Sequence, residues 1–403
     1  MPATAAQLKS NIWKLYVMQG IRGFMVMMPT IVLFFQENGL SMVEIFLLQT
    51  LFSVAIVVVE IPSGYFADRF GRRRSIILGS VLAFLSLVIY SFATDFWGFL
   101  AAETLLGIGF AFTSGADSAL LYDSLVETGG RDTYKRREGW SLSISNFSET
   151  IASVLGGYLA LITLRTPVIV EAFALFFLIP VAYSLYEARK HIPAAESVAW
   201  TMRKTIIHTL HTNAALRWII VLYALIFSSG LVMVWFRQPY LQEANVPLVY
   251  FGYIWAALML SVALSSLLSE YVEKTLGRRR TMLVVLGFMT AGYFILGIDT
   301  VWWFVPAMLL FCIGRGLWEP VIKDYVQVHA PSEVRATVLS IKSFAARSLF
   351  AILGPFAGWL ADIYTLQFAL IASGIFFLVF GVIATVLLIS AETRDSQAVA
   401  TSA

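Results

Sequence analysis

The sequence predicts an all-α membrane protein with about twelve transmembrane helices, arranged as two six-helix repeats. Three observations lead to this fold class. First, 59% of the 403 residues are hydrophobic and only 13% are charged, whereas soluble domains carry roughly 25% charged residues. Second, apolar runs follow one another along the chain, and a membrane-crossing helix needs roughly 20 such residues. Third, short motifs between and within these runs return about half a chain length later.

The apolar runs are separated by short polar or charged connections. Several runs exceed about 25 residues, which is consistent with tilted helices that project past the bilayer. We expect helices over residues 11–36, 41–68, 74–93, 96–126, 138–163, 166–188, 214–240, 246–272, 281–298, 301–328, 335–361 and 366–390.

Basic residues are concentrated in alternate connections between these helices. The other connections hold little besides Arg165 and Arg237, which lies near a helix end. Because Lys and Arg mark cytoplasmic loops, the basic connections and both termini are predicted to be cytoplasmic. The protein is therefore expected to be a multi-pass protein of the cytoplasmic (inner) membrane. The main basic clusters are Arg72–Arg74, Lys135–Arg137, Arg203–Lys204 and Arg278–Arg280.

The predicted organisation has four parts. Residues 1–188 form a first six-helix bundle, 189–213 a linker, 214–390 a second six-helix bundle and 391–403 a cytoplasmic tail. In the linker, apolar residues interleave with basic ones around Arg203. This pattern predicts an amphipathic segment that lies on the inner leaflet and contacts the lipid bilayer.

A charged turn, Gly64–Arg74, joins the second and third predicted helices. Gly71 permits a sharp reversal of the chain, and Gly64 leaves room for another helix to pack closely. Asp68 can hydrogen-bond neighbouring arginines or helix ends. We call this segment the switch loop, and its key residues are Gly64, Asp68, Arg69, Gly71, Arg72 and Arg73.

The pattern G-x-x-x-D-R-x-G-R-R in the switch loop resembles the signature loop of the major facilitator superfamily. It returns later as Glu273–Arg280, with one residue inserted, and Leu142–Phe147 returns as Leu339–Phe344. Two parallel repeats with a binding site between them are the architecture of that superfamily. The internal repeat and the resemblance therefore support the same fold.

The resemblance implies secondary transport by alternating access. It implies that Asp68 and Arg72 contact the region Arg335–Leu339 and stabilise the outward-facing state, and that helices 1, 4, 7 and 10 line a cavity. Two departures weaken drug/proton antiport as the specific activity. Glu103 stands where such antiporters of the superfamily usually have Arg, and only Gly156-Gly157 remains of their fifth-helix motif.

Charged residues within the apolar runs are functional candidates, because a charge in the bilayer core costs at least ~2.5 kcal/mol. The candidates for proton coupling are Asp117, Glu149 and Glu103. Arg22, Asp117 and Glu149 lie about 14 to 16 Å from the cytoplasmic helix ends. We expect one buried cluster, in which Arg22 neutralises one carboxylate and leaves the other to titrate. The alternative is a fixed Arg22–Asp117 ion pair that holds the bundle together.

The second half supplies further candidates for the cavity. Arg315 and Glu319 are one helical turn apart and share a face, so they either face substrate or form a fixed ion pair. Arg347 occupies the repeat position of Glu149, which would place opposite charges across a central cavity. Lys342 is expected to extend to the cytoplasmic surface. The cavity or substrate candidates are Arg22, Trp235, Arg315, Trp318, Glu319 and Arg347; Trp235 is either an interfacial residue or a cap over the cavity.

The sequence contains no nucleotide-binding, metal-binding or nucleophile motif. It therefore predicts no enzyme, no cofactor and no metal, and nothing in it indicates a nucleic-acid partner. The leading hypothesis is proton-coupled transport of a small organic molecule, with a preference for efflux. Sodium in place of protons stays open. The alternatives are a proton-coupled importer of a charged or zwitterionic metabolite and a non-transporting membrane receptor on the same fold. Family precedent implies that a monomer suffices.

Overall fold

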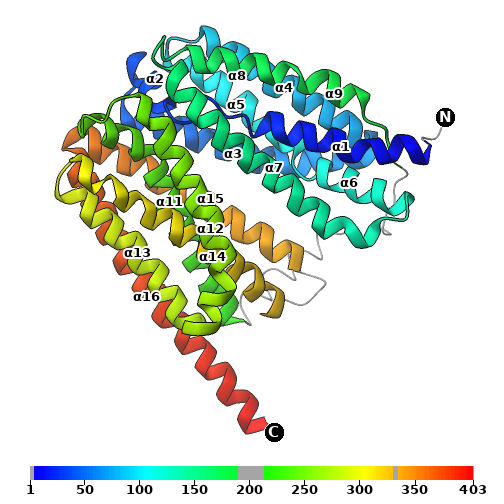
Figure 1. Cartoon of the computed structure of the whole chain (residues 1–403). Helices are drawn as coiled ribbons and strands as arrows, with labels where there is room; N and C mark the ends of the chain where they lie inside the picture. The colour runs from blue at the N-terminus through cyan, green and yellow to red at the C-terminus, as the bar shows by residue number, and fades with distance from the viewer. Residues whose placement is uncertain (1–3, 189–212, 330–334, 403) are drawn as a thin grey trace. The chain divides into compact units, whose positions relative to one another are not determined.

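The computed structural model describes residues 4–188, 213–329 and 335–402. These residues form α-helices and two short 3-10 turns, with no strand among them (Figure 1). The helices up to residue 188 are α1 (Ala5–Arg22), α2 (Ile31–Glu37), α3 (Met42–Phe70), α4 (Arg72–Phe92), α5 (Phe96–Thr113), α6 (Ala116–Glu127), α7 (Tyr134–Leu159), α8 (Thr166–Phe176) and α9 (Leu178–Ser184), with the turn η1 (Arg131–Thr133) before α7. The later helices are α11 (Ala214–Glu243), α12 (Val249–Leu276), α13 (Arg278–Ile298), α14 (Met308–His329), α15 (Arg335–Ile363) and α16 (Leu366–Ser402), with the turn η2 (Trp302–Ala307) before α14.

Ten helical stretches of the described chain are long and apolar enough to cross a membrane, judged by length and composition. They correspond to ten of the predicted runs. The runs predicted at 11–36 and 138–163 are not among them, because the first is broken and the second, α7, carries many polar residues. The described residues are therefore all-helical, with stretches suited to a multi-pass membrane protein. The count of twelve spans and the cytoplasmic orientation of the termini stay predictions.

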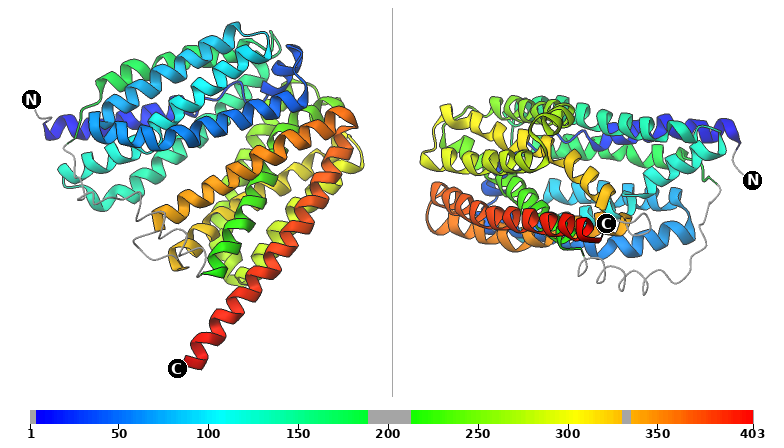
Figure 2. Two further views of the ribbon diagram at one scale, coloured as in Figure 1. Left: turned by 180° about the vertical axis from the view of Figure 1, so that it is seen from behind. Right: turned by 90° about the horizontal axis from the view of Figure 1, so that it is seen from below.

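Helix contacts divide the chain into two compact units. The first contains Met1–Pro193 and Pro247–Ala256, and the second contains Ala194–Val246 and Ala257–Ala403. The start of α12 thus belongs to the first unit by its contacts. Within the units, α4 packs against α5 and α13 against α16. The C-terminal part of α16, in red, extends beyond the other helices of its unit (Figure 2). The predicted linker, 189–213, lies almost entirely outside the described residues. In the predicted tail, 391–403, the described residues continue α16 as helix up to Ser402.

Several helices predicted as continuous are interrupted. The predicted helix 11–36 ends at Arg22 and resumes at Ile31, and the predicted helix 96–126 is divided between α5 and α6. At the second break Gly115 has φ +79°, a left-handed conformation that glycine adopts readily. Likewise, 166–188 is divided into α8 and α9, and 301–328 begins with η2. Long apolar runs mask such breaks, because hydrophobicity continues through them.

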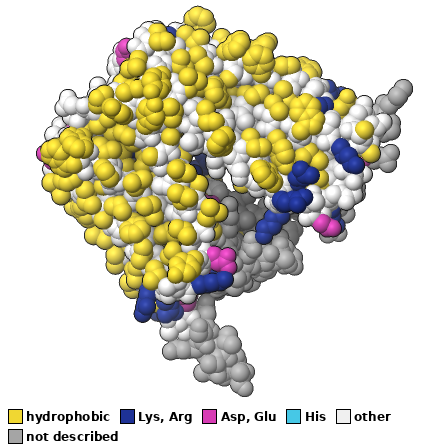
Figure 3. Space-filling model, viewed as in Figure 1, with side chains coloured by type: hydrophobic (Ala, Val, Ile, Leu, Met, Phe, Trp, Pro, Cys, Tyr) yellow, Lys and Arg dark blue, Asp and Glu magenta, His cyan; other side chains and the backbone are white. Residues whose placement is uncertain are grey.

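The outer surfaces of the helices suit a lipid environment. Hydrophobic side chains cover most of the face shown in Figure 3. Large apolar residues such as Leu267 and Ile61 are 81% and 82% exposed. Exposed apolar surface of this extent marks an interaction surface, which for a multi-pass protein is the bilayer.

Candidate functional site

The first ionisable pair lies where two broken helices meet. Arg22 is the last residue of α1, Asp117 is the second residue of α6, and Arg22 Nη1 lies 2.6 Å from Asp117 Oδ2. Gln19 Nε2 donates to the same oxygen at 3.0 Å. A cation at a helix C-terminus and an anion at a helix N-terminus are each stabilised by the helix dipole, by about 0.3–1 kcal/mol. Arg22 Nη2 is buried and has no hydrogen-bond partner in the described part of the chain.

Glu149 does not join this pair. Its Oε1 accepts a hydrogen bond from the indole Nε1 of Trp255 at 3.0 Å, and it forms no ion pair with any residue that the structure describes. Glu149 is half-buried, and Trp255 is buried. The structure therefore pairs Arg22 with one of the two carboxylates, Asp117, and gives Glu149 a separate partner. Depth along a helix is similar for these groups, but depth does not determine which way each side chain points around its helix.

The Glu149–Trp255 contact belongs to a close packing of α7 against the start of α12 within the first unit. The hydroxyls of Tyr158 and Tyr253 lie 2.7 Å apart. A Cβ on Gly157 would lie 2.9 Å from the carbonyl oxygen of Val249, so the two backbones nearly touch. We call these contacts the α7–α12 seam.

Glu103 lies in a separate, enclosed cluster. It is 5% exposed and accepts hydrogen bonds from Gln49 Nε2 at 2.5 Å and from the Tyr90 hydroxyl at 2.6 Å. These partners come from α3 and α4, which pack around α5. The carboxylate is satisfied by two donors and has little access to water.

Glu171 is a buried carboxylate that the sequence analysis did not single out. It is 5% exposed and accepts a hydrogen bond from the backbone N–H of Met27 at 2.9 Å. Met27 lies in the non-helical segment between α1 and α2, where backbone donors need partners. The signal was present in the sequence, since Glu171 interrupts the apolar run 166–188 just as Glu149 interrupts its own.

In the switch loop, Gly71 allows the reversal between α3 and α4. It has φ +111°, and a Cβ there would lie 2.7 Å from Glu187 Oε2. Glu187 accepts the backbone N–H groups of Arg72 and Arg73 at 2.8 and 2.9 Å. The carboxylate therefore caps the N-terminus of α4, where backbone donors have no partner inside the helix.

The arginines of the switch loop contact residues of the first unit. Arg72 Nη1 pairs with Asp123 of α6 and donates to the carbonyl oxygen of Ala119 at 2.6 Å. Arg69 donates to the Tyr65 hydroxyl at 2.8 Å. The expected contact of Asp68 and Arg72 with residues 335–339 falls mostly on side chains outside the described residues and stays a prediction.

Among the described residues of the first unit, no other helix packs closely at Gly64. Apart from the glycine's own helix backbone, no heavy atom of this unit lies within 4 Å of a Cβ built there. The motif marks the loop correctly, but the space beside this glycine is open.

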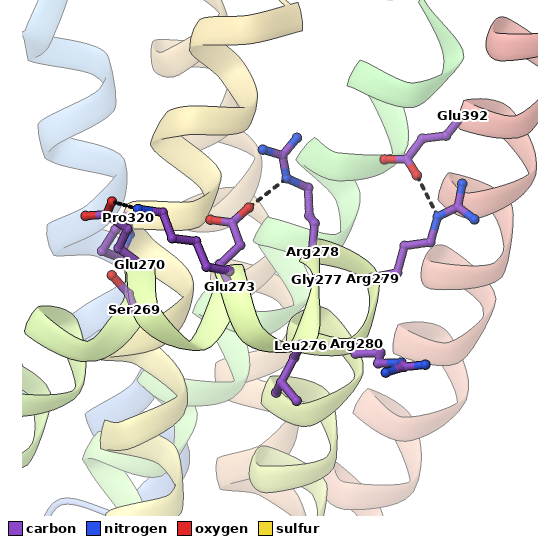
Figure 4. Close-up of a pocket in the computed structure, with 11 residues that line it drawn as sticks. Ser269, Glu270, Glu273, Leu276, Gly277, Arg278, Arg279, Arg280, Pro320 and Glu392 are labelled. Atoms are coloured by element: carbon purple, nitrogen blue, oxygen red, sulfur yellow. Dashed lines mark hydrogen bonds and ion pairs between the residues drawn. The ribbon is translucent and has the colours of Figure 1, made fainter.

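The second repeat of this loop opens a charged pocket of about 880 Å³ at the start of α13 (Figure 4). Arg278 pairs with Glu273 at 3.0 Å and Arg279 with Glu392 at 3.1 Å, while Arg280 points away from these pairs. Gly277 occupies the position of Gly71 in the second repeat, and like Gly71 it has a positive φ, +78°. Ion pairs that are open to solvent contribute about 0–1 kcal/mol each. We therefore interpret the charged residues around this pocket as part of a structural turn between α12 and α13, and not as a substrate site.

A second pocket, of about 330 Å³, lies wholly within the second unit, and we call it the α11–α14 pocket. Its charged lining residues are Arg237, Arg315 and Glu319. Its aromatic lining residues are Tyr223, Phe227, Phe311 and Trp318.

The carboxylate of Glu319 pairs with Lys342 and not with Arg315. Lys342 Nζ lies 3.6 Å from Glu319 Oε1 and 3.9 Å from the ring centroid of Tyr223, whose hydroxyl donates to Glu319 at 3.5 Å. Lys342 is 4% exposed, so the expectation that it extends to the surface is wrong. Arg315 is exposed and forms no hydrogen bond or ion pair with the described residues, which rules out the fixed Arg315–Glu319 pair in this structure.

The remaining candidates from the sequence lie elsewhere in the second unit. Trp235 is 6% exposed and packed inside the second unit, and its role as an interfacial residue or a cap over the cavity stays a prediction. Arg237 lies near the end of α11, as expected, and is 4% exposed. It lines the α11–α14 pocket and donates to Cys312 Sγ at 3.2 Å. The placement of Arg347 opposite Glu149 stays a prediction.

The comparisons with known proteins agree with this architecture. The family model of the Major Facilitator Superfamily matches residues 15–355. A tetracycline resistance protein, class E, of Escherichia coli is 22% identical over 325 residues, which are 76% of each chain. A probable vesicular acetylcholine transporter-B of Danio rerio is 32% identical over 103 residues, and the match spans only 20% of that relative's length.

A solved structure shows the same fold. The chain superimposes on a mutant of the nucleoside transporter NupG with a TM-score of 0.78 at 12% identity, covering 95% of this chain and 99% of the other. The family model covers most of the chain and confirms the resemblance seen in the switch loop. The chain therefore belongs to the major facilitator superfamily and is a membrane transporter, not an enzyme.

Proposed function

We propose that this protein is a proton-coupled secondary transporter that moves a small organic molecule out of the cell across the cytoplasmic membrane by alternating access. The observation that carries the proposal is Glu149. It is an ionisable group inside a helix of the transporter bundle, half-buried, with no cation paired to it among the described residues. Carboxylates in this position are typical of proton pathways.

Glu149 suits proton coupling better than the other two candidates. Asp117 is held by Arg22 at 2.6 Å, so protonating it requires breaking an ion pair. Glu103 is enclosed and accepts two hydrogen bonds. Glu149 accepts one hydrogen bond from a neutral indole. Binding or releasing a proton there therefore disrupts fewer contacts than at Asp117 or Glu103.

Protonation of Glu149 would act on the α7–α12 seam. A hydrogen bond to an ionised acceptor is roughly twice as strong as one between neutral groups. Adding a proton to Glu149 therefore weakens its bond with Trp255. The seam then depends on the tyrosine pair and on the close backbone contact at Gly157. We assign to this step the link between proton binding and movement of the start of α12.

The Arg22–Asp117 pair takes a positioning role in this proposal. It fixes the end of α1 against the start of α6, and Arg22 retains one buried nitrogen without a partner among the described residues. A substrate oxygen that reached this pair would give that buried nitrogen an acceptor. The switch loop, through Asp68 and Arg72, would stabilise the outward-facing state, as the family resemblance implies.

Export is the proposed direction. A relative named for tetracycline resistance supports it, because removal of a toxic compound would give resistance. Import of a charged metabolite with protons is the second candidate, favoured by the charged α11–α14 pocket. In neither case is a partner beyond substrate, protons and lipid needed, and we propose a monomer.

Energised everted membrane vesicles test the proposal. A pH-sensitive dye reports the proton gradient while a panel of anionic, neutral and cationic organic compounds is added. Proton-coupled export predicts that at least one compound collapses the gradient with the wild-type protein and not with empty vesicles. Uptake by right-side-out vesicles that depends on the gradient, with no response in everted ones, would show import. No response in either preparation contradicts proton coupling.

A further inference from the structure

The α11–α14 pocket has the size of a small-molecule site. Its volume of about 330 Å³ falls at the lower end of the usual range for ligand pockets, roughly 300–1,000 Å³. Its walls come from α11, α13 and α14, all within the second unit. The pocket is therefore complete within one unit.

Arg315 gives this pocket an unbalanced positive charge. It lies inside the apolar stretch Trp302–Ile322 and lines the pocket without a hydrogen bond or ion pair to the described residues. A guanidinium at membrane depth is costly unless it faces water or an anion. Glu319 does not compensate it, since Lys342 and Tyr223 already engage that carboxylate.

The rest of the lining is mostly apolar. Phe227, Leu231, Val234 and Phe311 line the pocket together with Trp318, and Arg237 adds a second guanidinium. The lining contains one carboxylate, Glu319, against these two guanidinium groups. Such a surface favours a ligand with one anionic group and an apolar body over a cation of the same shape.

We propose that the α11–α14 pocket binds an organic anion, with its carboxylate against Arg315 and its apolar body against Phe227 and Phe311. This inference rests on the proposed transport function, because it names the substrate class. A planar guanidinium binds a carboxylate through two parallel hydrogen bonds, which fixes the orientation of the ligand. Arg315 selects the charge of the ligand and the aromatic walls select its shape.

Binding to the purified full-length protein in lipid nanodiscs tests this proposal without any gradient. The probes are 4-phenylbutyrate and the neutral 4-phenylbutanol, measured by isothermal titration calorimetry. Wild-type protein is expected to bind the anion more tightly than the alcohol. Arg315→Gln should weaken binding of the anion by ~10- to 100-fold, the range for losing a charge-assisted hydrogen bond, and leave the alcohol unchanged. Arg280→Gln, at an exposed arginine outside the pocket, is the matched control.

A second variant keeps the test decisive if Arg315→Gln does not fold. Glu319→Gln removes the negative charge beside Arg315 and should tighten binding of 4-phenylbutyrate. Equal binding of both probes to the wild-type protein, binding of neither, or an equal loss of both in Arg315→Gln overturns the inference. Anion binding without proton flux in vesicles would instead refute the proposed function alone. Proton flux with a cationic compound, without anion binding, would refute this inference alone.

Discussion

Arg22 Nη1 lies 2.6 Å from Asp117 Oδ2, at the place where α1 ends and α6 begins. The two side chains are 21% and 12% exposed, so the pair is largely shielded from water. Each charge also compensates the dipole of its own helix terminus. The pair therefore links two helix interruptions that hydrophobicity alone did not reveal.

Removing one member of this pair is expected to destabilise the protein. Asp117→Asn and Arg22→Gln should each lower the free energy of unfolding by about 1–3 kcal/mol, because the remaining charge loses its partner. The double variant should lose less than the sum of the two, since the contact is removed only once. Thermal unfolding in detergent measures this cycle. Strictly additive losses would show that the two side chains do not interact.

The two glycines of the switch loop should respond in opposite ways to alanine. Gly71→Ala adds a side chain to a residue whose φ is +111° and places it against Glu187. This strain should lower the free energy of unfolding by about 1–3 kcal/mol. Gly64→Ala lies inside α3 with open space around it and should stabilise the helix by about 0.5–1 kcal/mol. Thermal unfolding of both variants provides the comparison. Equal effects would contradict the assigned backbone at Gly71.

Glu103 is expected to be structural and not a proton carrier. Glu103→Gln retains an oxygen that accepts from Tyr90 and Gln49, so proton-coupled transport should continue. Glu103→Leu leaves both donors buried without an acceptor and should cost about 1–3 kcal/mol of stability. Dye-based proton flux and thermal unfolding separate the two effects. Loss of coupling in Glu103→Gln, in a folded protein, would move the proton site to Glu103.

The α7–α12 seam should tolerate no added side chain. A Cβ on Gly252 would collide with the backbone of Ser153, so Gly252→Ala is expected to lower both the unfolding temperature and the transport rate. Gly287→Ala, inside α13 with open space around it, is the matched control. Like Gly64→Ala, it should raise the unfolding temperature slightly, and it should leave the transport rate unchanged. Wild-type behaviour of Gly252→Ala would show that the seam is looser than this structure indicates.

The fold could be predicted from the sequence, because long apolar runs and the repeated switch loop depend on composition and local motifs. The breaks near Gly23 and Gly115 were not predicted, because the few polar residues beside them do not end the long apolar runs. At Gly23 a Cβ would lie 2.8 Å from Ser145 Cα, so the position is set by a helix distant in sequence.

The site was only partly predictable for a related reason. The cost of membrane charges identified Arg22, Asp117 and Glu149, but their partners depend on rotation around each helix. The sequence therefore did not reveal that Trp255 binds Glu149 or that Lys342 binds Glu319. Glu171 met the same charge criterion and was overlooked, and Arg237 was noted only as a residue near a helix end.

The central claim is that the proton bound at Glu149 drives transport. The most direct test reconstitutes wild-type protein and Glu149→Gln in proteoliposomes and compares two assays of the compound that the vesicle panel identifies. One assay is exchange without a gradient, and the other is accumulation driven by an imposed pH gradient. We predict that Glu149→Gln still exchanges the compound but no longer accumulates it. Accumulation equal to that of the wild type would contradict the account and place the coupling proton elsewhere.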